Sequence, residues 1–162
     1  MQKQKSDARF MALALSLGRR GMGRVWPNPA VGCVIVRDGV IVGRGRTADG
    51  GRPHAETEAL CQAGDKARGA TAYVSLEPCS HHGKTPPCAN ALIDAGIAEV
   101  VVATGDPNPQ VSGAGIAMLE AAGIAVRMGI LKEQADADHA GFFLTQTRGR
   151  PYITLKLATT LD

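Results

Sequence analysis

Apolar residues recur at helical spacing near the start of the chain. Their intervals of i, i+3, i+4 and i+7 predict a helix between Ser6 and Gly18. Ser6 is suited to cap this helix, Asp7 lies near its positive end, and Gly18 is suited to end it. The apolar positions are Phe10, Leu13, Ala14 and Leu17.

Beyond this helix, runs of β-branched and apolar residues alternate with segments of helical spacing. The runs 30–36 and 40–46 are joined by Arg37-Asp38-Gly39, which predicts a hairpin. The alternation predicts an α/β fold, a three-layer α/β/α sandwich around a central, mostly parallel five-stranded sheet. In such folds, sites form where strand ends meet helix N-termini. Further strands are expected at 70–76, 98–104, 124–130 and 152–158, and helices at 54–64, 86–95, 115–123 and 131–147.

Composition limits the class of protein. The chain has 162 residues, of which 44% are hydrophobic and 20% charged, which fits one folded domain and excludes intrinsic disorder. Its apolar runs are too short to span a bilayer, and Arg19-Arg20 stands where a signal peptide needs small residues. We therefore expect a cytoplasmic protein without a membrane partner. The net charge is +3, and residues 1–53 hold 10 Lys and Arg against 3 Asp and Glu, which suits a phosphate-bearing ligand, a nucleic acid or a solvated face.

The four cysteines fall into two kinds. Without a secretory signal, disulfides are not expected. Cys33 and Cys61 lie among apolar residues, and we expect both to be small buried hydrophobes. Cys79 and Cys88 each follow a proline and can stand at a helix start, where the helix dipole and free N–H groups stabilise a thiolate. A thiolate is a strong metal ligand.

A third candidate ligand is His54, in the segment Pro53-His54-Ala55-Glu56. His54 and Glu56 can share a site only if His54 stands at the very start of its helix, a position that the preceding proline favours. Three nitrogen and sulfur ligands would leave one open position on tetrahedral zinc, as in catalytic sites. Zinc lowers the pKa of a bound water molecule to about 7, and Glu56 could then accept and return a proton. These residues therefore indicate hydrolytic attack on a polarised carbon.

At these motifs the chain resembles the zinc-dependent cytidine-deaminase-like superfamily, whose signature pairs His-x-Glu with Pro-Cys-x2-Cys. Here the residues from Ser80 to Pro87 separate the cysteines, in place of the usual two. This long spacing is similar to the deaminase domain of the bifunctional riboflavin-biosynthesis deaminase/reductase. The segments 27–32, 105–109 and 113–124 support the resemblance, which covers residues 6–147.

The resemblance implies a cytidine-deaminase-like fold and a specific reaction. The family hydrolyses the 2-amino group of 2,5-diamino-6-(5-phosphoribosylamino)pyrimidin-4(3H)-one, giving 5-amino-6-(5-phosphoribosylamino)uracil and ammonia. Motif by motif, it implies one Zn2+ per chain, Glu56 as proton shuttle, and Lys84 at the ribose phosphate. The implied zinc ligands are His54, Cys79 and Cys88. The implied substrate contacts are Asn28, His81, Lys84, Thr85 and Asp106.

The last residues resemble the opening strand of the family's NADP-dependent reductase domain. We therefore expect residues 1–147 to be the deaminase domain and residues 148–162 the start of a reductase domain that is missing here. A reductase needs a whole nucleotide-binding domain, so NADP belongs to the missing domain only and this chain is not expected to reduce a substrate. The expected partners are a small phosphoribosylaminopyrimidine and further copies of the chain in a homo-oligomer, with no nucleic acid.

Two other functions stay open. A deaminase of another base, such as tRNA adenosine, cytosine or guanine, fits the zinc motif and the basic first third. Against it stand the long cysteine spacing and the few aromatic side chains available to stack a base, with 1 Trp, 2 Tyr and 3 Phe. A non-catalytic module with a structural zinc would leave Glu56 without a role and lacks a fourth ligand.

Three other residues carry weaker expectations. His82 and His139 are interpreted as exposed surface residues. Trp26 either lines the mouth of a pocket or covers the core.

Overall fold

The computed structural model describes residues 2–81, 86–107 and 112–160, and its five strands form one sheet. The strand order is β2-β1-β3-β4-β5. Strand β1 pairs antiparallel with both β2 and β3, whereas β3, β4 and β5 are parallel neighbours. The predicted α/β fold and its five-stranded sheet are confirmed; four strands share one direction, and β1 runs against them. The strands are β1 (Gly32–Arg37), β2 (Val40–Arg46), β3 (Thr71–Val74), β4 (Glu99–Val102) and β5 (Ala125–Met128).

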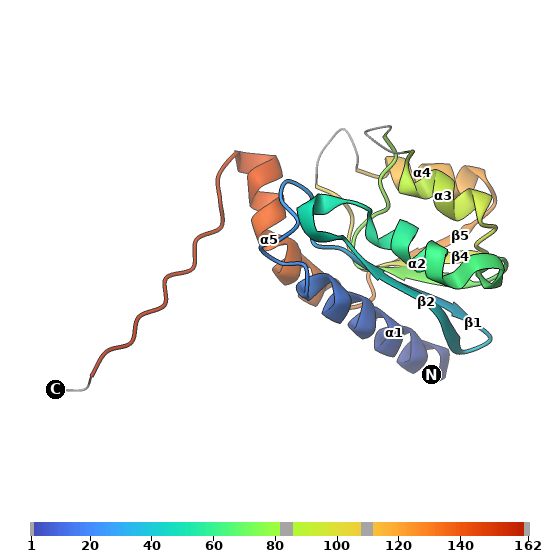
Figure 1. Cartoon of the computed structure of the whole chain (residues 1–162), viewed down its shortest axis with the longest axis horizontal. Helices are drawn as coiled ribbons and strands as arrows, with labels where there is room; N and C mark the ends of the chain where they lie inside the picture. Colours follow the sequence, from blue (N-terminus) through green and yellow to red (C-terminus); the bar gives the residue numbers. More distant parts are fainter. Residues whose placement is uncertain (1, 82–85, 108–111, 161–162) are drawn as a thin grey trace.

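Helices cover both faces of the sheet, which gives the predicted three layers (Figure 1). The helices α1 and α5 lie on one face, where Val34 and Tyr73 point, and α2, α3 and α4 lie on the other, where Ile35 and Val74 point. Neighbouring residues of a strand thus enter opposite cores, as the two-residue period of a strand requires. The helices are α1 (Gln2–Arg19), α2 (Ala55–Ala63), α3 (Cys88–Asp94), α4 (Ala114–Ala121) and α5 (Lys132–Arg148), with 3-10 turns η1 (Asp49–Gly51) and η2 (Gly64–Ala67).

Strand β2 and helix α2 pack unusually closely at Gly45. A Cβ atom at Gly45 would lie 2.2 Å from the carbonyl oxygen of Ala55, so a larger residue would push the first turn of α2 off the sheet. His54 directly precedes this turn as the N-cap residue of α2. The glycine therefore helps to fix where His54 stands.

The start of the chain differs from its predicted form. Helix α1 begins at Gln2, so Ser6 does not cap it, and Asp7 lies buried inside the helix and not in its first turn. The Tyr73 hydroxyl donates to Oδ1 of Asp7 over 2.7 Å, and Nη1 of Arg127 donates to Oδ2 over 2.8 Å. Asp7 thus links α1 to two strands of the sheet, an arrangement that no local pattern could reveal.

The predicted strand 152–158 does not form. Residues 150–160 contain neither helix nor strand, and they extend away from the sheet and helices (Figure 1). A strand needs a neighbour for its backbone hydrogen bonds, and this segment lies beside none of the five strands. No helix in the described part of the chain combines the length and the apolar character that a bilayer crossing requires.

Two further predictions about single residues are decided by the packing of α5 and of the loop after α1. His139 is 2% exposed, so its prediction as a surface residue is wrong. It follows Ala135 by one helical turn, and both face the interior although the segment around them is polar. Trp26 is 75% exposed and does not cover the core; it lines a surface cavity beside α5. His82 lies outside the described residues.

Candidate functional site

The predicted site residues converge at one edge of the sheet. Strands β2, β3 and β4 run in the same direction and therefore end at the same edge, where β1 begins. His54 follows β2, Cys79 follows β3, Asp106 follows β4, and Cys88 is the first residue of α3. The expectation that strand ends and helix starts would bring the reactive residues together is thus confirmed.

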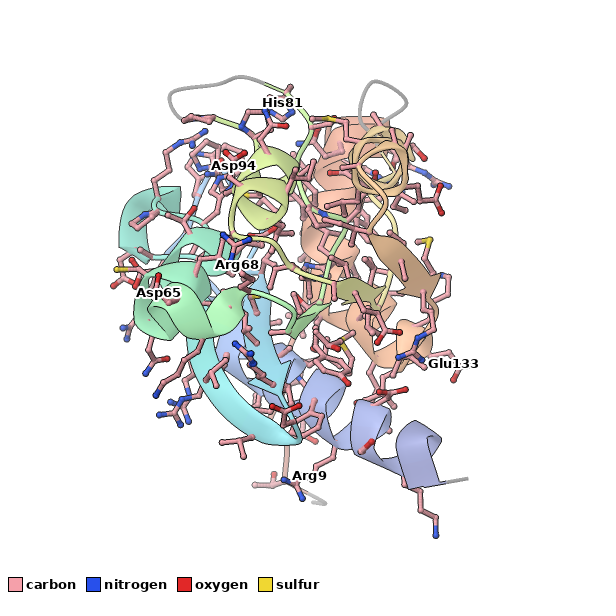
Figure 2. The ribbon with its side chains drawn as sticks, turned by 90° about the vertical axis from the view of Figure 1, so that its right-hand side faces the viewer. Arg9, Asp65, Arg68, His81, Asp94 and Glu133 are labelled. Carbon is pink, nitrogen blue, oxygen red and sulfur yellow. The ribbon has the colours of Figure 1, made fainter. Side chains whose placement is uncertain are left out.

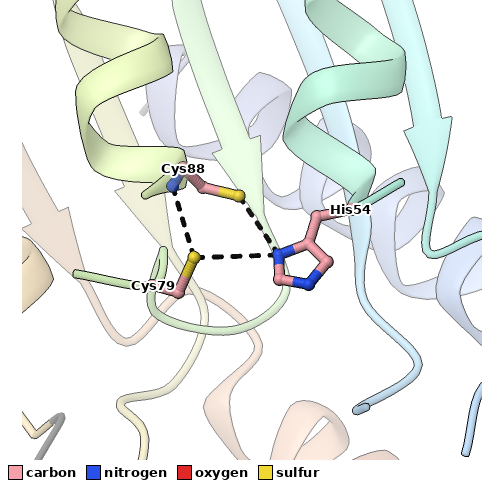
Figure 3. A group of neighbouring side chains, drawn as sticks. All are labelled: His54, Cys79 and Cys88. Carbon is pink, nitrogen blue, oxygen red and sulfur yellow. Dashed lines mark hydrogen bonds between the residues drawn. The ribbon is translucent and has the colours of Figure 1, made fainter. Parts of the chain in front are cut away.

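His54, Cys79 and Cys88 form a compact group of possible metal ligands (Figure 3). The Nδ1 atom of His54 lies 3.3 Å from Sγ of Cys88 and 3.7 Å from Sγ of Cys79. The backbone N–H of Cys88 donates to Sγ of Cys79 over 3.2 Å. One donor atom from each residue lies within 4.8 Å of the others, and this is the one such group of three found among the described residues.

The three side chains of this group differ in how far their pKa values are shifted. A hydrogen bond from the Cys88 thiol, aided by His54, lowers the pKa of Cys79 to about 4 in spite of partial burial. The pKa of Cys88 is raised, first because its proton is held in that hydrogen bond and second because the thiol is buried. The hydrogen bond to Cys79 also raises the pKa of His54. Two sulfurs and one ring nitrogen that lie within 4.8 Å of one another are a donor set that fits zinc.

Glu56 stands beside this group, in the first turn of α2. Its side chain is 4% exposed. Burial, and secondarily the negative charge of Cys79, raises the pKa of Glu56 to about 7, while the Cys88 thiol hydrogen-bonds to the carboxyl group. A carboxyl group with a pKa near neutral pH can both take up and release protons during a reaction.

A cavity of about 240 Å³ opens next to the metal-ligand group. Three of the predicted substrate residues, Asn28, His81 and Asp106, line it together with Glu56. Nδ2 of Asn28 donates to the carbonyl oxygen of Gly51 over 2.6 Å and lies 3.2 Å from Nε2 of His54. Figure 2 shows His81 at the loop end of the molecule, far from Glu133 and Arg9. Lys84 and Thr85, the other predicted substrate residues, lie outside the described residues.

The cavity also contains residues that the sequence motifs did not assign. Phe142 and Gln146 reach it from α5, and Arg52 reaches it from the loop before His54. Glu77, which precedes the Pro-Cys motif, lines it as well. Arg52 and Glu77 adjoin motif residues and could have been suspected from the sequence. Phe142 and Gln146 could not, since they lie far along the chain in a helix without a motif.

The two remaining cysteines behave differently from each other. Cys33 is fully buried as predicted, and burial raises the pKa of its thiol. Cys61 is exposed, so its prediction as a buried residue is wrong. The buried face of α2 is formed by Ala55, Ala59 and Ala63, and a residue two positions after Ala59 is turned about 200° away from it. Neither cysteine belongs to the metal-ligand group.

Comparison with known proteins gives a consistent result. A family model described as the cytidine and deoxycytidylate deaminase zinc-binding region matches residues 4–104. The riboflavin biosynthesis protein RibD of Escherichia coli is 55% identical over 156 residues, which cover 96% of this chain and 42% of the relative. A solved structure of Acinetobacter baumannii RibD has a TM-score of 0.88 and 50% identity, covering 92% of this chain and 42% of that one. The chain thus spans less than half the length of these relatives.

A shorter relative is covered almost completely. The diaminohydroxyphosphoribosylamino-pyrimidine deaminase of Buchnera aphidicola subsp. Acyrthosiphon pisum is 49% identical over 146 residues, which cover 90% of this chain and 99% of the relative. The metal-ligand group and the buried Glu56 are consistent with the zinc-binding deaminase family that these similarities indicate. The chain belongs to the cytidine and deoxycytidylate deaminase zinc-binding family, within the group that includes the diaminohydroxyphosphoribosylamino-pyrimidine deaminase.

Proposed function

We propose that this chain is a zinc-dependent hydrolytic deaminase of riboflavin biosynthesis. Its substrate would be 2,5-diamino-6-(5-phosphoribosylamino)pyrimidin-4(3H)-one, and its products 5-amino-6-(5-phosphoribosylamino)uracil and ammonia. The observation that carries the proposal is the buried carboxyl group of Glu56, which lies beside the group His54, Cys79 and Cys88 and lines the adjoining cavity. The 49% identity to a named deaminase, 99% of which this chain covers, supports this choice of substrate.

His54, Cys79 and Cys88 would hold the zinc ion. When bound there, zinc would supply the activation of a water molecule for attack at neutral pH. Cys79 is already held as a thiolate, because hydrogen bonds from Cys88 and His54 lower its pKa to about 4. The protein would therefore offer zinc one negatively charged ligand, the Cys79 thiolate, before the metal binds.

Glu56 would move the protons of the reaction. Its pKa of about 7 means that the carboxylate and the carboxylic acid are both accessible at neutral pH. As a base, it would accept a proton from the attacking water molecule. As an acid, it would then donate a proton to the departing amino group, which leaves as ammonia.

Asn28, His81, Thr85 and Asp106 would contact the substrate, and Lys84 would bind the ribose phosphate. The Nδ2 atom of Asn28 is engaged by Gly51 and faces His54. Its Oδ1 atom is then the atom offered to an N–H group of the pyrimidine ring. A lysine close in sequence to His81, which lies at the rim, suits a phosphate that projects out of the cavity.

Ammonia release by the purified, zinc-loaded chain tests this function. Wild type should release ammonia from the diaminopyrimidine ribotide, and Glu56→Ala should lower the rate by about two to four orders of magnitude while keeping zinc. Glu58→Ala is the matched control, because Glu58 is an exposed residue in the same turn of α2. Turnover of cytosine, guanine or tRNA adenosine in place of the ribotide would reassign the substrate. A near-normal rate in Glu56→Ala would contradict the role of Glu56.

We further propose that residues 1–147 are the deaminase domain and residues 148–162 the start of a reductase domain, its linker and first strand, and that only the reductase domain would need NADP. In support, four apolar side chains of the extended segment are 62–82% exposed, as a strand lacking its sheet would leave them. They are Tyr152, Ile153, Leu155 and Leu157. We also propose that the chain forms a homo-oligomer and is located in the cytoplasm. Light scattering would test the oligomeric state.

A further inference from the structure

A buried carboxylate adjoins the metal-ligand group without taking part in it. Glu77 is 5% exposed and stands two residues before Cys79. Its Oε2 atom accepts hydrogen bonds from the backbone N–H groups of Asp106 over 3.2 Å and of Gly113 over 3.1 Å. Its Oε1 atom accepts one from the N–H of Gly115 over 3.1 Å. Hydrogen bonds to a charged acceptor are among the stronger ones in proteins.

These donors stand on both sides of the connection between β4 and α4. Asp106 follows β4, and Gly115 lies in the first turn of α4, where N–H groups lack partners within the helix. The backbone of Glu77 adds a fourth link, since its N–H donates to the carbonyl oxygen of Thr104 over 3.0 Å. The chain leaving β3 and the chain leaving β4 are therefore tied together beyond the end of the sheet.

A close backbone contact accompanies these bonds. A Cβ atom at Gly115 would lie 2.0 Å from the carbonyl oxygen of Pro78, so the start of α4 rests directly on the peptide before Cys79. The same segment thus carries a metal ligand on one side and supports α4 on the other. Any shift of α4 or of Asp106 relative to Cys79 would have to break this packing.

We propose that Glu77 is a positioning residue, which holds the Asp106 side of the substrate cavity at a fixed place relative to Cys79. The proposal rests on the proposed function for its effect on turnover, although the contacts themselves do not depend on it. Without the carboxylate, the amides of Asp106, Gly113 and Gly115 would lose their acceptor. The cavity wall would loosen, while Cys79 would stay held by the N–H of Cys88.

The variant Glu77→Gln tests this role with little change of shape. An amide group cannot accept at both of its ends, so at least one of the backbone donors would face an NH2 group. We expect KM for the ribotide to rise about tenfold with a smaller change in kcat, because the loss concerns substrate placement. Zinc content should stay at one ion per chain. Glu99→Gln is the matched control, since Glu99 is also a carboxylate in the β3–β4 region but binds Arg127 away from the cavity.

Amide hydrogen exchange gives a readout that needs no activity. In wild type, the N–H of Gly113 should exchange slowly although the residue is exposed, and Glu77→Gln should speed exchange at Asp106, Gly113 and Gly115. Unchanged exchange together with an unchanged KM would overturn the proposal, as would loss of zinc with KM unaffected. If Glu77→Gln does not fold, fast exchange of Gly113 in the wild-type protein would overturn it. A wild-type chain that is inactive on the ribotide would instead contradict the proposed function and leave the exchange test standing.

Discussion

The Nε2 atom of His54 lies 3.2 Å from Nδ2 of Asn28, on the side of the ring opposite the two cysteines. This contact requires Nε2 to accept, as it does when the ring proton is on Nδ1; once Nδ1 binds a metal, the proton lies on Nε2, and the NH2 group of Asn28 cannot accept it. We therefore expect Asn28→Ala to keep a zinc affinity close to that of wild type and to raise KM, because Asn28 would serve the substrate through its Oδ1 atom. Competition with a chromogenic chelator would measure the zinc affinity.

Asn90→Ala is the control for this variant, because Asn90 lies in α3 and does not line the cavity. It should bind zinc as wild type does. A clearly weaker zinc affinity in Asn28→Ala would contradict this expectation and make Asn28 a support of His54.

The two classes of cysteine should separate clearly in zinc content. Cys79→Ser should lose zinc and turnover, because its thiolate lies within 4.8 Å of the other two donor atoms. Cys61→Ser should keep one zinc per chain, since Cys61 is exposed on α2 and outside the group. Metal analysis of both purified variants makes the comparison. Zinc loss from Cys61→Ser would favour a structural zinc site in place of a catalytic one.

The buried ion pair of Asp7 should matter for stability and not for the reaction. Asp7→Asn would remove the buried charge that Tyr73 and Arg127 share, although Arg127 would still pair with Glu99, and we expect a loss of about 2 kcal/mol in the free energy of unfolding. Asp138→Asn breaks an ion pair with Arg19, whose side chain is 47% exposed. This substitution should lower the free energy of unfolding by less than about 1 kcal/mol. Urea unfolding would measure both, and equal losses would contradict the distinction.

His139 should make stability depend on pH below neutrality. Burial lowers the pKa of His139, and Asp138, the backbone of Ser75 and Asp136 offset this only in part. In the unfolded chain the imidazole would take up a proton below about pH 6.5, which the folded protein resists. Its contribution to stability is therefore complete above that pH and is lost as the pH falls.

The comparison of variants isolates this contribution. His139→Gln should show a shallower loss of unfolding free energy between neutral and mildly acidic pH than wild type. His81→Gln, which replaces an exposed histidine, should follow the wild-type profile. Any acid-induced release of zinc affects all three proteins alike. Parallel profiles for His139→Gln and wild type would refute the argument.

Local pattern was sufficient for most of the fold and for the reactive centre. Helical spacing and the Asp38-Gly39 turn signal predicted five helices, the hairpin and the strands of the sheet, because these depend on neighbours a few residues apart. His54 and Cys88 were placed correctly at helix starts, whereas Cys79, which also follows a proline, begins no helix. The motifs likewise predicted that His54, Cys79 and Cys88 would lie together.

What only the tertiary structure decided concerns residues far apart along the chain. Asp7 and Arg127 are 120 positions apart, and the burial of both Asp7 and His139 depends on how helices settle on the sheet. Phe142 and Gln146 enter the cavity, and Glu77 reaches the amides beyond β4, for the same reason. The segment 152–158 has a strand-like pattern, but a strand exists only where another strand supplies its hydrogen bonds. The amino-acid sequence by itself thus determined the elements and the chemistry, while long-range packing determined burial, the cavity walls and the supports of the site.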